Sequence, residues 1–286
     1  MNLKALSICL ASLLCSSAAL SSDKTEADSI LRPVNKTFAI EAGASQLTDT
    51  YLSPIKYTGW HTALSYERLQ AMKANPDNLI MQLRLSLGID KGTNPAGNHE
   101  MWNGQLNFSW GVLRRWKQPN GFSVGAGSSI SLKAGCLYID RSGNNPASAK
   151  GAITLNATAY ATWNGNIGKL PVTLRYQPTI PVIGAFFAPD YGELYYEIYL
   201  GNRSNLAHCA WWGNYFNFDH TLSADLHFGS TSLRIGYSGS IYSTKINHTA
   251  TNIFTHAAII GVSGDWISIN PQKRLTPKVK TILATY

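Results

Sequence analysis

The chain has 286 residues, of which only 14% are charged, and it carries 24 Gly, 14 Tyr and 8 Trp. This composition favours turns and aromatic strands, so it argues against a mainly helical protein. The formal net charge is +8, but the Lys and Arg are scattered, which argues against nucleic acid and leaves lipid headgroups or small polar and anionic solutes as partners.

Residues 1–21 have the layout of a secretory signal peptide, because Lys4 precedes the apolar run ALSICLASLLCSSAAL and small residues follow it. We therefore expect cleavage and export. The polar stretch SDKTEADSILRPVNK ends at residue 36, so 22–36 is expected to be a short periplasmic lead and 37–286 a single domain. No later stretch reaches the roughly 20 apolar residues of a membrane helix, so insertion into a membrane would require a β-barrel.

Several later segments alternate apolar and polar residues with a period of two, which indicates strands with two different faces. In NLIMQLRLSL (78–87) the apolar residues lie on one face, and Gln82 and Arg84 lie on the other. The pattern recurs in MWNGQLNFSWGV, FSVGAGSSISLKA, ITLNATAYATW, VTLRYQPTI, LSADLHF and SLRIGYSGSIY. Many such strands of about ten residues are typical of a transmembrane barrel, although a soluble sandwich has a similar pattern.

Tryptophan placement favours the barrel over the sandwich. Six Trp lie on or at the ends of the expected strands, where residues of an interfacial girdle would lie: Trp60, Trp102, Trp110, Trp116, Trp163 and Trp266. The sequence therefore predicts a protein of the cell outer membrane.

The connections alternate in length, as they do in barrels with short periplasmic turns and longer outer loops. Short links are expected at 70–77, 117–121, 165–171 and 229–230, and longer ones at 46–56, 90–100, 140–150, 184–218 and 245–253. Because both barrel ends lie in the periplasm, 184–218 must contribute either no membrane strands or two. Its candidates are ELYYEIYL and the poorer HCAWWGNYFNF. We expect an all-β fold, a single antiparallel barrel of ten or twelve strands, with twelve slightly favoured.

The tightest hairpin predicts a register. Gly229 and Ser230 form a Gly-X pair suited to a type II′ turn, which places Asp225 opposite Arg234 on the polar face. We expect an ion pair there, inside the barrel. The further titratable residues expected in this lumen network are Glu67, Arg84, Lys133, Arg175, Glu197 and His227. Such a network can plug a barrel of this size.

A catalytic site is the less favoured interpretation of the polar faces. Ser223, Asp225 and His227 offer a nucleophile, an acid and a base at i, i+2 and i+4 of one strand. Side chains two positions apart lie about 6.6 Å apart along a strand, so Ser223 and His227 are too distant for a hydrogen bond. The His residues show no metal-ligand spacing, and we expect neither a metal nor a cofactor.

Two cysteines remain after the signal peptide is removed, in an oxidising compartment. Cys136 ends a strand on the outer side, and Cys209 lies in the 184–218 segment. They either form a disulfide that pins this segment or stay as free thiols, which is the simpler alternative.

Six stretches carry a family resemblance: AGASQLTDTYLSPIKYTGWHTALSYERLQAM (42–72), WGVLRRW (110–116), LPVTLRYQPTIPV (170–182), YGELYYEIYLGN (191–202), WWGNYF (211–216) and SADLHFG (223–229). Together they resemble a domain-of-unknown-function family of outer-membrane proteins from Bacteroidota. The resemblance covers nearly the whole exported chain and implies an outer-membrane barrel without an assigned function. No catalytic residue follows from it.

Three functions remain open for an outer-membrane barrel in contact with lipid. A small pore, or a barrel that binds solutes or lipids, is favoured and predicts a lumen lined by small polar residues. An outer-membrane lipid or lipopolysaccharide hydrolase would need a Ser or Asp close to a His at the outer rim. A structural or surface-interaction barrel predicts a plugged lumen, with loops that make the contacts.

Overall fold

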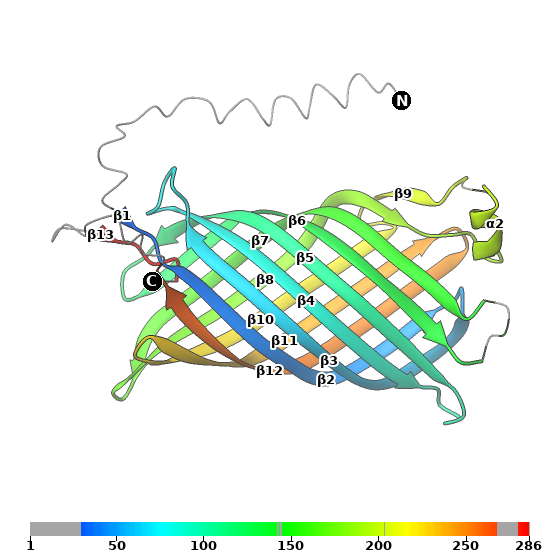
Figure 1. Ribbon diagram of the computed structural model, residues 1–286, viewed down its shortest axis with the longest axis horizontal. Helices are drawn as coiled ribbons and strands as arrows, with labels where there is room; N and C mark the ends of the chain where they lie inside the picture. Colours follow the sequence, from blue (N-terminus) through cyan, green and yellow to red (C-terminus); the bar gives the residue numbers. More distant parts are fainter. Residues whose placement is uncertain (1–29, 142, 144, 203, 268–279, 286) are drawn as a thin grey trace, which may run out of the picture.

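The computed structural model describes residues 30–141, 143, 145–202, 204–267 and 280–285, so the expected signal peptide lies outside the described residues. Ten long antiparallel strands close into one barrel (Figure 1). The ring is closed because β12 pairs with β2 and β10 pairs with β8. Its strands are β2 (Val34–Asp49), β3 (Ser53–Ala71), β4 (Leu79–Thr93), β5 (Glu100–Lys117), β6 (Phe122–Ile139), β7 (Ala147–Ile167), β8 (Leu170–Phe187), β10 (Tyr215–Phe228), β11 (Thr231–Ile246) and β12 (Thr249–Trp266).

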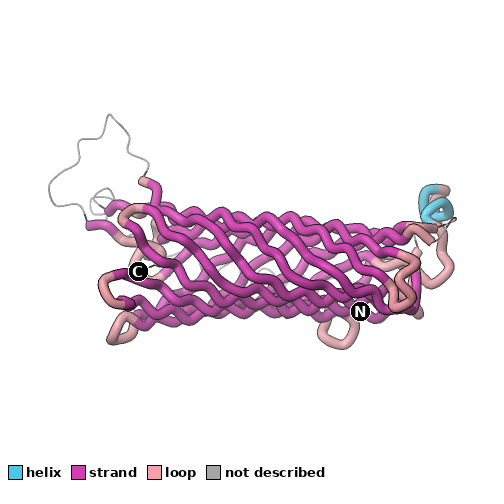
Figure 2. The backbone as a smooth tube through the Cα atoms, turned by 90° about the horizontal axis from the view of Figure 1, so that it is seen from below, coloured by secondary structure: helices cyan, strands magenta, loops and turns pink. Residues whose placement is uncertain are grey.

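The two ends of the barrel differ. At one end, which we call the termini end, β2 begins, β12 ends, and short turns join the other strands in pairs. At the opposite end, which we call the loop end, lies the long 188–214 connection with its short helix (Figure 2). The longer connections 94–99, 140–146 and 188–214 lie at the loop end as the sequence predicts, but two connections expected to be long are tight turns, at 50–52 and 247–248.

Along each barrel strand, most polar residues of the alternating sequence face the lumen and most apolar residues form the outer wall. On β4, Gln82 is 4% exposed and faces inward, whereas Leu85 and Leu87 are 40% and 53% exposed on the outside. The other barrel strands follow the same rule: most buried residues are small or polar, and most exposed ones are large and apolar. This arrangement is the reverse of a soluble barrel.

The preference for twelve strands is wrong, because 184–218 adds no membrane-spanning pair. ELYYEIYL forms the short helix α2 (Tyr195–Tyr199), flanked by Gly192 and Gly201 at φ values of 86° and 111°, which interrupt an extended chain. Among the described residues, no helix is long and apolar enough to cross a membrane.

The other expected strand of this segment is broken. Its first part is β9 (Ala207–Ala210), which pairs with the loop end of β8, and its second part begins β10. Residues 211–218 lie opposite 180–183 of β8, because Ala210 pairs with Gly184 but Asp219 pairs with Thr179. Pro178 and Pro181 of β8 have no N–H to donate, which weakens the ladder at this point.

The chain ends differ from the expected boundaries. Within the expected lead, β1 (Ile30–Leu31) pairs in parallel with β13 (Lys280–Thr281) at the termini end. The strand β12 ends at Trp266, and the described residues 280–285 pair with the expected lead and not with a barrel strand. The barrel strands in the described part of the chain therefore span 34–266, against the expected 37–286.

The turn between β11 and β12 gives a first testable prediction. Asn247 and His248 have φ values of 52° and 57°, as a two-residue type I′ turn requires. His248→Gly should raise the free energy of unfolding by up to about 1 kcal/mol, because a left-handed conformation is unfavourable for residues other than Gly. The His248 side chain is 88% exposed, so loss of its contact with Asp190 should matter little.

Denaturant unfolding of the refolded barrel, followed by tryptophan fluorescence, measures this effect. Asn247→Gly is the matched control, because it removes hydrogen bonds from Asn247 Nδ2 to the carbonyl oxygens of Ala188 (3.2 Å) and Asn205 (3.1 Å). We expect no gain for this control. A loss of stability in His248→Gly would contradict the prediction.

Candidate functional site

The lumen is the candidate site, and an apolar layer of side chains narrows it near the loop end. The apolar layer consists of Leu47, Tyr57, Met101, Leu137, Ile139 and Ile253, all at most 7% exposed. These residues point inward from five of the ten barrel strands, so apolar side chains occupy part of the cross-section that would be wet in an open pore. Near the same end of the barrel, Lys150 Nζ lies 2.9 Å from Asp49 Oδ2. Inward apolar residues here were not expected from the sequence.

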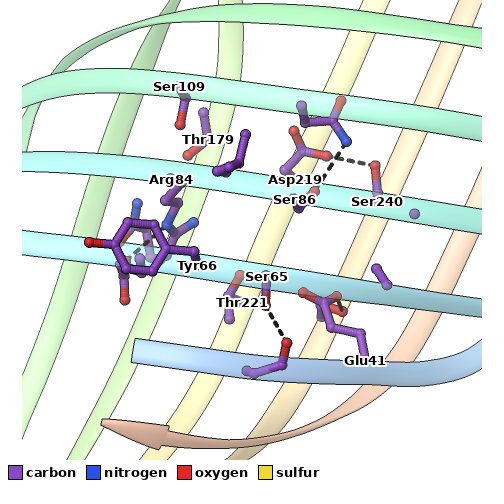
Figure 3. A pocket seen from close by; sticks show the side chains of 18 of the residues that line it. Glu41, Ser65, Tyr66, Arg84, Ser86, Ser109, Thr179, Asp219, Thr221 and Ser240 are labelled. Atoms are coloured by element: carbon purple, nitrogen blue, oxygen red, sulfur yellow. Dashed lines mark hydrogen bonds and ion pairs between the residues drawn. The ribbon is translucent and has the colours of Figure 1, made fainter. Parts of the chain in front are cut away.

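A cavity of about 200 Å³ lies between the apolar layer and the termini end (Figure 3). Most of the polar side chains in its wall are hydroxyls and amides, and its charged members are Glu41, Glu67, Arg84, Lys133, Asp219 and Arg234. Lys133 Nζ donates to Asn217 Oδ1 at 2.7 Å and lies 3.2 Å from Asp219 Oδ2. The cavity is large enough for several water molecules or for a solute slightly larger than benzene.

A buried pair of His61 and Asp90 lies beside this cavity, and His61 contributes to its wall. Nδ1 of His61 lies 2.6 Å from Asp90 Oδ1, and Asn103 Nδ2 donates to Asp90 Oδ2 at 2.7 Å. The second ring nitrogen of His61 has no hydrogen-bond partner in the described part of the chain. This pair was not expected from the sequence, although the parity of the alternating strand places His61 on the same face as Glu67.

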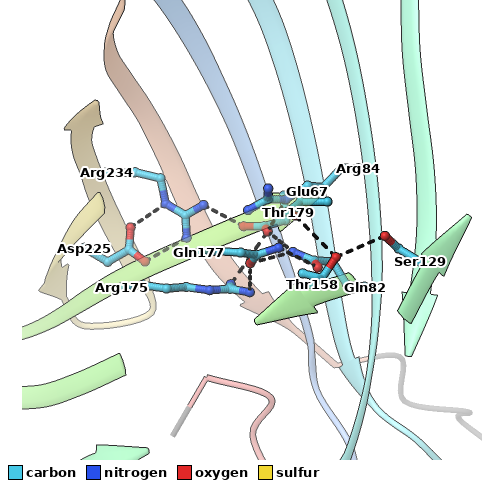
Figure 4. Close-up of polar contacts among 10 residues, drawn as sticks. All are labelled: Glu67, Gln82, Arg84, Ser129, Thr158, Arg175, Gln177, Thr179, Asp225 and Arg234. Carbon is cyan, nitrogen blue, oxygen red and sulfur yellow. Dashed lines mark hydrogen bonds and ion pairs between the residues drawn. The ribbon is translucent and has the colours of Figure 1, made fainter. Parts of the chain in front are cut away.

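Glu67 is the centre of a charged cluster that forms the floor of the cavity. The charged cluster consists of Glu67, Arg84, Arg175, Asp225 and Arg234 (Figure 4). Arg84 Nε donates to Glu67 Oε1 at 2.9 Å, and Arg234 Nη1 donates to Oε2 at 2.7 Å. Arg175 Nη1 lies 3.6 Å from Oε1. One carboxylate thus holds three guanidinium groups.

Asp225 and Arg234 form the second part of the cluster. Arg234 donates through Nε to Oδ1 at 2.7 Å and through Nη2 to Oδ2 at 2.8 Å, so the pair is bidentate. The two residues lie opposite each other in the ladder between β10 and β11. This is the register that the Gly229–Ser230 turn predicts.

Two glutamines extend the cluster across the lumen. Gln82 on β4 and Gln177 on β8 exchange hydrogen bonds of 2.9 and 3.1 Å. Gln82 also donates to Glu67 Oε1 at 2.7 Å, and Arg175 Nη2 donates to Gln177 Oε1 at 2.6 Å. Three strands separate β4 from β8 on one side of the ring and five on the other, so the link joins opposite walls. The network crosses the lumen.

The three catalytic candidates are not assembled into a catalytic arrangement. The ring nitrogens of His227 lie 2.8 Å from Thr173 Oγ1 and 2.6 Å from Ser232 Oγ, while Asp225 is held by Arg234. Ser223 is 3% exposed and lies four positions from His227 on β10. The hydrolase hypothesis therefore gains no support from these residues. No group of three His, Cys, Asp or Glu in the described ranges could hold a metal ion.

The structure places Glu197 outside the lumen network and selects the simpler of the two cysteine alternatives. Glu197 lies on α2 outside the lumen and accepts a hydrogen bond from the Leu194 N–H at the start of the helix (3.4 Å). Cys136 and Cys209 are both exposed free thiols, because their strands β6 and β9 are separated by β7 and β8.

The helix is instead anchored by a tyrosine. The Tyr195 hydroxyl accepts a hydrogen bond from the Ala149 N–H at 2.6 Å. Burial raises the pKa of Tyr195 to about 12, so this hydroxyl stays neutral at physiological pH.

A family model described as "Protein of unknown function (DUF3316)" matches residues 6–273. The chain belongs to the DUF3316 family. The expected family of unknown function is therefore confirmed, whereas an origin in Bacteroidota stays an expectation. No curated protein matches this DUF3316 chain.

Solved barrels resemble this DUF3316 protein in outline. The outer membrane protease OmpT from Escherichia coli is 6% identical with a TM-score of 0.43, over 82% of this chain and 97% of that chain. Neisserial surface protein A is 10% identical with a TM-score of 0.35, over 82% and 97%. The translocator domain of the autotransporter NalP from Neisseria meningitidis is 10% identical with a TM-score of 0.37, over 92% and 97%. Likenesses of this size carry no inference about activity.

Proposed function

We propose that this protein is an outer-membrane barrel that is closed to free diffusion and acts through its outer surface. The observation that carries the proposal is the cross-lumen network centred on Glu67. This is the plugged-barrel alternative from the sequence, and it replaces the favoured pore.

The outer wall supports a place in a membrane. Trp102 and Trp116 lie fourteen positions apart on β5, which corresponds to about 46 Å along the strand and about 35 Å along the axis at a tilt of about 40°. From Trp102 to Val112 the outward residues are apolar or Gly, including Leu106, Phe108 and Trp110 at 38–44% exposure. The one outward charge before Trp116 is Arg114, whose guanidinium lies 5.6 Å from the Trp116 ring at the termini end. Such a band matches an outer-membrane barrel with aromatic residues at both rims. Trp110, expected at a rim, lies within the band.

Cations mark both rims of this band. Lys91 Nζ lies 5.1 Å from the Trp102 ring at the loop end, and Lys36 Nζ lies 5.4 Å from the Trp266 ring at the termini end. Each pair places a charge beside an aromatic ring where headgroups and water would meet. Both barrel termini favour the periplasm for the termini end, and the long 188–214 connection favours the outside for the loop end.

The loop end offers the surface for contacts. Five aromatic side chains of the 188–214 connection are 61–81% exposed: Tyr191, Tyr196, Tyr199, Trp211 and Trp212. Loops that expose several aromatic side chains mark interaction surfaces more often than loops without them do. A partner at the cell surface is therefore the proposed target.

Planar-bilayer recording of the refolded protein tests the closed lumen. We expect no steady single-channel current, with folding verified by heat-modifiable migration on gels and a general porin recorded as the positive control. Sustained conductance steps from the folded barrel would contradict the proposal and restore the pore.

A further inference from the structure

The residues after β13 enter the barrel at the termini end. Ile282 and Ala284 are each 5% exposed, although they belong to no wall strand. Ala284 packs with Leu69, Ile80, Leu113 and Tyr160, which point inward from β3, β4, β5 and β7. The tail segment, residues 280–285, thus covers an apolar patch at this mouth of the barrel.

Arg115 holds the backbone of the tail segment. Its side chain is 2% exposed, and Nη1 donates to the carbonyl oxygens of Leu283 at 2.9 Å and Ala284 at 3.1 Å. Nη2 donates to the Asp77 carbonyl at 3.0 Å, which fixes the guanidinium against the β3–β4 turn. Contacts to backbone carbonyls recognise an extended chain and not a particular side chain.

The remaining attachment of the tail segment is small. Lys280 and Thr281 pair with Ile30 and Leu31, and the Ile282 N–H donates to the Leu31 carbonyl at 2.9 Å. Lys280 Nζ also lies 3.3 Å from Asp77 Oδ1, but both side chains are more than half exposed, so this ion pair adds little. A two-residue parallel pair is marginal on its own. Segments with so few contacts open locally at a free energy far below global unfolding.

The tail segment covers part of the lumen that is otherwise reachable from this end. Between Ala284 and the charged cluster remains a space of about 10 Å³, lined among others by Ser123, Thr162 and Arg175. Ser123 is 7% exposed in this position. Removal of the tail segment would open this side of the charged cluster to solvent.

We infer that the termini-end mouth is a binding site for an extended C-terminal peptide, and that the chain's own tail segment occupies it reversibly. The ligand class is a peptide with an apolar residue, one intervening residue and a small apolar residue, as in Ile282, Leu283 and Ala284. The carbonyls of the last two of these residues accept hydrogen bonds from Arg115. The inference rests on the proposed function only for its periplasmic orientation.

Thiol labelling of a lumen cysteine tests this inference in detergent. Ser123→Cys is introduced into a chain with Cys136→Ser and Cys209→Ser, and its reaction with a cationic methanethiosulfonate is timed. Deletion of residues 280–286 should accelerate labelling at least tenfold. A synthetic KTILATY peptide should restore protection of the shortened chain, whereas a scrambled peptide should not. Ser230→Cys, at an exposed turn, should react equally fast in every chain.

Each result decides the inference. Equal rates in the full and shortened chains would show that the tail segment covers nothing, and failure of the peptide to protect would show that the mouth is no peptide site. If the shortened chain does not migrate as a folded barrel, Ala284→Trp in the full chain takes its place, because a large ring cannot fit the patch and should release the tail segment. The bilayer recording is independent, so a conducting wild type would overturn the closed lumen without deciding the labelling result.

Discussion

Glu67→Gln should destabilise the folded barrel by about 3–5 kcal/mol, the range expected when one partner of a buried ion pair is removed. The Glu67 carboxylate is 8% exposed and faces three guanidinium groups, with contacts of 2.7 to 3.6 Å. The amide keeps the shape of the side chain but removes its charge. Only Asp225 then remains to offset the three guanidinium groups of the charged cluster, two of which are buried.

Urea unfolding in lipid vesicles measures this loss, and Glu100→Gln is the matched control. Glu100 pairs with Lys91 at 2.7 Å, but the two side chains are 40% and 28% exposed, so its loss should cost less than about 1 kcal/mol. If both substitutions had the same small effect, the charged cluster would not stabilise the barrel.

Leu132→Arg should destabilise the barrel in vesicles by about 2–4 kcal/mol, as a charge at mid-depth on a lipid-facing wall does. Leu132 is 51% exposed on the outside of β6 and pairs with Phe108 and Ile153, near the middle of the apolar band. In a soluble protein the same change at an exposed position would have little effect. The substitution therefore tests the membrane assignment directly.

Phe228→Arg is the control for this prediction. Phe228 is 60% exposed, but it adjoins the turn at Gly229 and lies at the termini end, so we expect a cost of at most about 1 kcal/mol. Equal effects of the two substitutions in vesicles would place Leu132 outside lipid and contradict an outer-membrane barrel.

The sequence predicts those features of the fold that local geometry determines. Strand faces follow from the period of two, and the pairing of Asp225 with Arg234 follows from the two-residue turn that joins their strands. The pairing of His61 with Asp90 could not be derived this way, because the longer 72–78 connection leaves the register of β3 and β4 open.

Contacts across the lumen are beyond sequence reasoning of this kind. Glu67 meets Arg234 because β12 pairs with β2 and closes the ring, which leaves only two strands between β3 and β11. The error at 184–218 had a local cause: Tyr and Ile suit both strand and helix, and Gly192 and Gly201 decided against a strand. The tail segment is too short to show any period.

The two hydrogen bonds between Gln82 and Gln177 are compatible with only one barrel diameter. A barrel's diameter grows roughly in proportion to its number of strands, so one added hairpin would widen this one by about one fifth. Hydrogen bonds of 2.9 and 3.1 Å could not stretch to match. Gain or loss of a hairpin, an available route to new barrel sizes, would therefore require the whole interior to be rebuilt at the same time.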